Sequence, residues 1–79
     1  GETSQINMAI QEMAELIKEL TDISRNRTTK EKLATEIADV QITLKQLEII
    51  FNKQYNNFSK LVEEEKTKKL ERLKKNLQN

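Results

Sequence analysis

The chain has 79 residues, with 14 Lys and Arg against 13 Asp and Glu, so its net charge is +1. It contains no His and no Cys, which excludes catalytic triads built on them, imidazole metal ligands and zinc–thiolate sites. The near-neutral balance argues against a dedicated nucleic-acid binder, and no apolar run approaches the roughly 18–20 residues of a membrane span. A single small self-associating domain over residues 1–79, in the cytoplasm, is expected, and any catalysis must use carboxylates, lysines, hydroxyls or a bound ion.

Three helices are predicted, over residues 4–22, 28–52 and 57–77. Two polar clusters, at 21–28 and 52–57, separate them because Asp, Ser, Asn and Thr side chains compete with helical hydrogen bonds. Thr28 followed by Glu31 has the spacing of a capping box, which predicts the start of the second helix. The sequence has no strand-like alternation, so the predicted fold class is all-α.

The apolar residues of the first two helices indicate how the helices pack. The first helix has one stripe with the spacing of a core-facing surface, formed by Ile6, Ala9, Ile10, Met13, Leu16, Ile17 and Leu20. The second helix is apolar on two sides, one formed by Leu33, Ile37, Val40, Leu44, Leu47 and Phe51, the other by Ala34, Ala38, Ile42 and Ile49. The second side is predicted to meet another subunit, so the three-helix protomer is expected to form a helical bundle by oligomerisation, as a dimer or a tetramer.

Acidic side chains interrupt these apolar surfaces. On the second helix Glu36 projects about 40° from Val40, and Asp39 projects about 100° from it. On the first helix Glu12 and Glu15 lie three residues apart, which makes them neighbours that can bind one ion from one side. If the two helices pack antiparallel, four carboxylates converge, and such oxygen ligands suit Mg²⁺ or Mn²⁺. The alternative is that these are ordinary surface acids.

The third helix places cations where aliphatic residues are expected. Lys66 and Lys69 lie on the line of Phe58, Val62 and Leu73, and Arg72 follows on its flank. Beside an acidic metal site, Lys66, Lys69 and Arg72 would suit the phosphates of a nucleoside triphosphate. The alternative is that the lysine stems extend along the helix to solvent.

Two segments carry a family resemblance. The segment from Gln11 to Leu20 reads QEMAELIKEL, and the segment from Glu36 to Val40 reads EIADV. Together they resemble the Glu-x-x-Glu and Glu-x-x-Asp motifs of the MazG-like all-α nucleoside triphosphate pyrophosphohydrolases, and residues 65–73 are similar to the tail of short phage and bacterial members.

The resemblance implies a function. Mg²⁺ would be held by Glu12, Glu15, Glu36 and Asp39, and a nucleoside triphosphate would be hydrolysed to a monophosphate and pyrophosphate, as a nucleotide-pool house-cleaning activity. Glu12 or Glu15, as the catalytic carboxylate, would orient or deprotonate the attacking water. Two alternatives remain open: a non-enzymatic helical oligomerisation module, and a degenerate family member that binds nucleotide without hydrolysis.

Overall fold

The structure, a computed structural model that describes residues 1–78, consists of three α-helices. Helix α1 spans Glu2–Ser24, α2 spans Lys30–Gln54 and α3 spans Phe58–Gln78. The described residues contain no strand, so the all-α prediction is confirmed. The predicted first helix is two residues shorter than the observed one at each end. The predicted second and third helices begin and end too early, by two residues and by one residue. Over the described range, no helix combines the length and the apolar character needed to cross a membrane.

The connection between α1 and α2 is set by Asn26 and Thr29. Asn26 has a φ of 57°, the left-handed conformation that Asn tolerates better than most residues and that commonly ends a helix. Thr29 is the N-cap of α2: its extended backbone lets Oγ1 accept a hydrogen bond of 3.2 Å from the backbone N–H of Lys32. The predicted capping box at Thr28 is therefore wrong by one residue.

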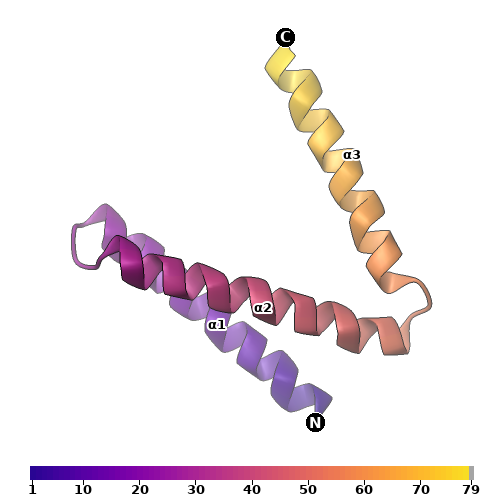
Figure 1. Cartoon of the computed structure of the whole chain (residues 1–79), viewed down its shortest axis with the longest axis horizontal. Coiled ribbons are helices and arrows are strands. Elements are labelled where there is room, and N and C mark those ends of the chain that lie inside the picture. Colours follow the sequence, from indigo (N-terminus) through magenta and orange to yellow (C-terminus); the bar gives the residue numbers. More distant parts are fainter. Residues whose placement is uncertain (79) are drawn as a thin grey trace.

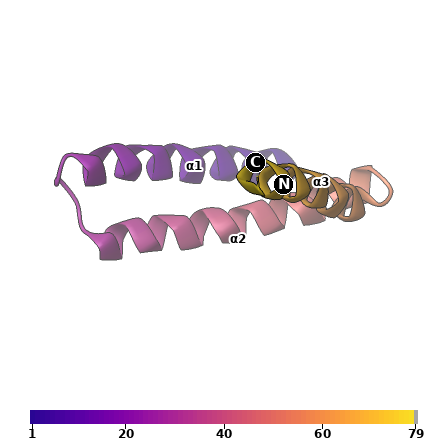
Figure 2. The same cartoon turned by 90° about the horizontal axis from the view of Figure 1, so that it is seen from above.

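Helices α1 and α2 form an antiparallel hairpin, and they run side by side along most of their length (Figures 1 and 2). The contact between them is narrow. Among the described residues only Ala9, Val40 and Ile50 are buried apolar side chains. Glu19, Glu36 and Thr43 are buried in the same chain, so polar groups occupy as many buried positions as apolar ones.

Helix α3 projects away from the hairpin (Figure 1). It is held at its first turns, where the rings of Phe51, Tyr55 and Phe58 lie 5.5–6.3 Å apart between centroids. Asn57 has a φ of 61°, and Asn52 Oδ1 accepts a hydrogen bond of 3.0 Å from the backbone N–H of Ser59. Within the described residues α3 contacts α2 and makes no contact with α1.

Both apolar sides of α2 are only partly covered within one chain. On the side that was expected to form the core, Ile37 and Leu44 remain 40% and 47% exposed. On the opposite side, Ile42 and Ile49 are 59% and 53% exposed. The second side thus has the exposure that a subunit contact requires.

Candidate metal centre

Three carboxylates meet between α1 and α2. Glu12 and Glu15 lie one turn apart on α1, and Glu36 comes from the facing part of α2; each offers one oxygen, and these oxygens lie within 4.8 Å of one another. The predicted convergence of these three side chains is confirmed. It follows from the antiparallel hairpin, because the first turns of α2 face the middle and the second half of α1.

Asp39, the fourth predicted ligand, lies one turn beyond Glu36 on α2 and is half-buried. It is not among the three residues whose oxygens lie within 4.8 Å of one another. Its negative charge nevertheless acts on Glu12 and contributes to raising the pKa of that carboxyl. Asp39 therefore lies at the edge of the cluster, and its role as a ligand stays a prediction.

Glu36 is the most deeply buried member of the cluster, with 5% of the residue exposed. Its two oxygens have different surroundings. Oε1 lies 3.4 Å from Nζ of Lys32, an i,i+4 ion pair whose lysine side chain is 56% exposed. Oε2 is buried and has no hydrogen-bond partner. A buried carboxylate oxygen without a donor or a cation is costly, so this atom lacks a partner that a bound ion would supply.

The neighbouring carboxylates of the cluster affect the pKa of Glu12. Burial raises the pKa of this carboxyl above its usual value of 4.5, and the charges of Glu15, Asp39 and Glu36 raise it further. Glu12 also has a buried oxygen, Oε2, without a hydrogen-bond partner. Both observations follow from one arrangement: Glu12 is partly desolvated and lies close to other negative charges. A bound cation or a proton would relieve this repulsion.

The donor set fits a small divalent cation. Mg²⁺ binds oxygen ligands at about 2.0–2.1 Å in an octahedron, so two oxygens on the same ion lie about 3 Å apart when adjacent and about 4.2 Å apart when opposite. The three oxygens of Glu12, Glu15 and Glu36, within 4.8 Å of one another, would need to approach by up to about 2 Å, a shift that side-chain rotation supplies. Carboxylate oxygens are also the ligand type that Mg²⁺ and Mn²⁺ prefer.

The predicted phosphate-binding residues lie elsewhere in the chain. Lys66, Lys69 and Arg72 are exposed on α3, the helix that leaves the hairpin (Figure 1). The ammonium of Lys66 lies 3.2 Å from Glu63 Oε1 on the same helix. Within one chain, the structure does not bring these three cations to the carboxylate cluster.

Two residues near the cluster were not among the predicted site residues. Glu19 is 8% exposed, and its Oε2 is buried without a hydrogen-bond partner. Its spacing of seven residues from Glu12 was the available signal, because residues seven apart lie on nearly the same side of a helix. Lys32 precedes Glu36 by four residues, which is the spacing of a helical ion pair.

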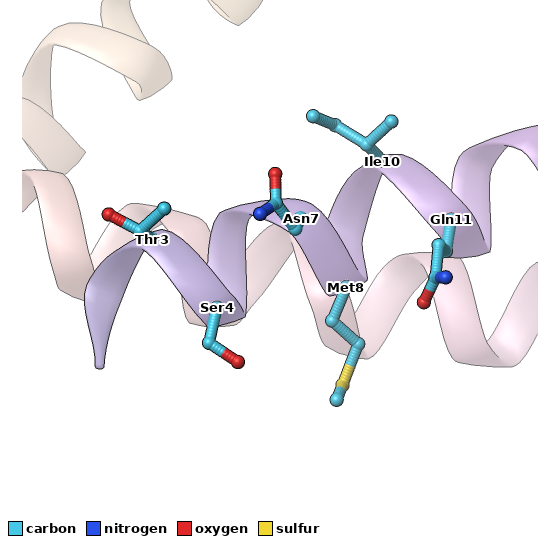
Figure 3. Close-up of a pocket in the computed structure, with 6 residues that line it drawn as sticks. All are labelled: Thr3, Ser4, Asn7, Met8, Ile10 and Gln11. Atoms are coloured by element: carbon cyan, nitrogen blue, oxygen red, sulfur yellow. The ribbon is translucent and has the colours of Figure 1, made fainter.

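A shallow surface pocket lies at the start of α1 and is lined by Thr3, Ser4, Asn7, Met8, Ile10 and Gln11. All six residues belong to one helix, and their side chains diverge: Ile10 points to the opposite side from Met8 and Gln11 (Figure 3). None of them is a titratable or charged side chain. The carboxylate cluster is therefore the stronger candidate for chemistry.

No protein-family model, no curated protein and no solved structure matches this chain. The resemblance to the MazG-like enzymes therefore rests on the two acidic motifs and their sequence context.

Proposed function

We propose that this protein is a Mg²⁺-dependent nucleoside triphosphate pyrophosphohydrolase, which cleaves a nucleoside or deoxynucleoside triphosphate to the monophosphate and pyrophosphate. The observation that carries the proposal is the partnerless Oε2 of Glu36, buried among two further carboxylates. A coiled-coil surface does not require three converging carboxylates, whereas a cation site does. The motifs around these acids support the same reaction, with a role in clearing the nucleotide pool.

The four carboxylates would bind the metal, and one of them would also accept a proton. Glu12, Glu15, Glu36 and Asp39 would hold Mg²⁺, which when bound acidifies water and offsets the charge that develops on the leaving pyrophosphate. Glu36 is held by Lys32 at one oxygen and serves as a fixed ligand. Glu12 has a raised pKa, which suits it to accept a proton from the water that attacks the α-phosphorus.

The remaining phosphates need positive charge, for which Lys66, Lys69 and Arg72 are the proposed source. All three are exposed and therefore accessible to a ligand. Because α3 does not contact α1 within the described chain, these side chains would reach a triphosphate at the cluster only through a movement of α3 or from another copy of the chain.

The test is an assay of pyrophosphate release from a panel of ribo- and deoxyribonucleoside triphosphates with Mg²⁺. The wild-type protein should release pyrophosphate from at least one of them, and Glu36→Gln should reduce turnover by about a hundredfold or more. Glu19→Gln is the matched control, because Glu19 is also buried with a partnerless Oε2 but lies outside the three-carboxylate cluster. Full Mg²⁺-dependent activity in Glu36→Gln would contradict the assignment.

One observation favours the alternative of a non-enzymatic oligomerisation module: Glu36 does have a cation partner, Lys32. That pair balances one negative charge and engages one oxygen, and it leaves Glu12, Glu15 and the second oxygen of Glu36 without a partner cation. The two functions differ in their response to metal. A site that binds Mg²⁺ only in the folded state raises the melting temperature, whereas a module without a metal site does not respond.

A further inference from the structure

The hairpin has an open apolar face. Helix α1 contributes Ile10, Ile17 and Leu20, which are 56%, 65% and 49% exposed, and α2 contributes Ile37 and Leu44, at 40% and 47%. A projection at about 100° per residue places all five on one side of the antiparallel pair. Leu44 also lines the groove that α2 forms with Phe58 and Val62 of α3, so α3 leaves the hairpin on this side. The same projection places Glu15 and Asp39 on the opposite side.

Helix α3 extends beyond this face as an arm, residues 66–77. Every residue of the arm is exposed, and its apolar members Leu70, Leu73 and Leu77 are 63%, 58% and 87% exposed. A groove between α2 and α3 continues the open face toward the arm; its apolar walls are Leu44, Leu47, Phe51, Phe58 and Val62. A single chain thus presents a concave apolar surface with a helical arm on one flank.

The surface area of the chain is too large for a compact monomer. The chain exposes 6623 Å², whereas a folded monomer of its mass exposes about 5,000 Å². The radius of gyration is 15.8 Å, against about 11.6 Å for a compact domain of this length. If each chain of a dimer buried the excess, the interface would total about 3,200 Å², within the range of obligate homodimers.

The arm has the leucines that can cover the open face. Leu70, Leu73 and Leu77 repeat at spacings of three and four residues, so they lie on one side of α3. Within the described residues of one chain α3 makes no contact with α1. A second copy supplies these leucines to the open face.

We propose that the open face is a homodimer interface, in which the arm of each copy packs on the hairpin of the other. Leu70, Leu73 and Leu77 of each arm cover the open apolar face of the other copy. This assembly buries the surface that one chain leaves exposed and does not rest on the proposed hydrolase function, because it uses the side of the hairpin opposite to Glu15 and Asp39.

Sedimentation equilibrium of the full chain, with helix content measured by circular dichroism, tests this interface. The wild-type protein should have twice the monomer mass or a multiple of that. The double variant Leu70→Glu/Leu73→Glu should raise the dissociation constant by about a hundredfold or more, since it buries charges without partners. The matched control Ile42→Glu/Ile49→Glu alters two equally exposed residues on the other side of α2 and should leave at least a dimer.

A helical wild-type monomer at millimolar concentration would overturn the proposal, as would an arm variant that dimerises as tightly as the wild type. A control variant that dissociates while the arm variant does not would also overturn it, because the contact would then lie on the other side of α2. If the arm variant unfolds, the melting temperature of the wild type decides: it must rise with protein concentration for a dimer, and an unchanged value rejects the dimer.

Discussion

Glu12 on α1 and Glu36 on α2 each have a carboxylate oxygen, Oε2, that is buried and has no hydrogen-bond partner. The two side chains come from the two helices of the hairpin and share a cluster with Glu15. Hydrophobic packing alone does not account for this arrangement, since burying an unpaired charge lowers stability. A cation bound between these carboxylates would offset this loss of stability.

Replacing Glu36 by Gln is expected to separate stability from metal binding. The amide removes one negative charge from the cluster, so the metal-free variant should melt at the same temperature as the wild type or higher. Its melting temperature should no longer rise with Mg²⁺. Thermal melts followed by circular dichroism, with and without Mg²⁺, measure both effects, and Glu19→Gln should keep the wild-type response to Mg²⁺. A Glu36→Gln variant that retains that response would contradict the assignment.

The pH dependence of the metal-free protein should report on Glu12. The pKa of its carboxyl is raised in the folded state, mainly by burial and then by the neighbouring carboxylates. The folded state therefore holds this proton more tightly than the unfolded state does, and its contribution to stability is complete below the usual pKa of 4.5. That contribution is lost as the pH rises from there through the raised pKa.

The measurement is the free energy of unfolding in urea at several pH values, for the wild type and for Glu12→Gln without metal. Glutamine does not titrate, so the difference between the two profiles isolates this carboxyl. The wild type should lose stability relative to the variant as the pH rises above 4.5. Parallel profiles would show that Glu12 titrates as an ordinary surface acid.

Replacement of Glu19 by an apolar residue is expected to stabilise the fold. It is 8% exposed, and its Oε2 has no hydrogen-bond partner. Glu19→Met should raise the free energy of unfolding by about 1–3 kcal/mol, because a buried acceptor without a donor is replaced by an apolar group of similar length. Urea denaturation checks the value. A loss of stability would indicate that Glu19 has a partner in the assembled protein.

Thr29 should stabilise the start of α2 through its side chain, which accepts a hydrogen bond from the Lys32 N–H. Thr29→Ala should lower the free energy of unfolding by about 1 kcal/mol. Thr35→Ala is the control, since its hydroxyl donates to the backbone oxygen of Glu31 inside the helix and no terminal amide depends on it. Equal losses in both variants would show that Thr29 does not act as a cap.

The hairpin could be predicted from the sequence because its two determinants are local. Polar residues at 21–28 interrupt a strong helical periodicity, and a short connection favours antiparallel packing. Antiparallel packing of the two helices then brings Glu12 and Glu15 close to Glu36. The cap moved from Thr28 to Thr29 because the exact residue depends on the backbone angles of the turn, which the side-chain pattern does not specify.

The direction of α3 could not be predicted in the same way. It depends on the left-handed backbone of Asn57 and on the contact of Phe51 with Phe58, neither of which has a periodic signal. The expectation that Lys66 and Lys69 point toward the acidic site assumed that α3 packs beside the hairpin. In one chain it does not, so a role for these lysines depends on an assembly or a movement of α3.

Binding of a divalent cation by the carboxylate cluster is the central claim, and Mn²⁺ provides its most direct test because free Mn²⁺ in solution has a characteristic electron paramagnetic resonance spectrum. Titration of the wild-type protein with Mn²⁺ should reduce the free-ion signal in a saturable manner, Mg²⁺ should restore it by competition, and Glu36→Gln should leave it undiminished. A wild-type titration in which the free signal follows the added Mn²⁺ at every concentration would contradict the claim.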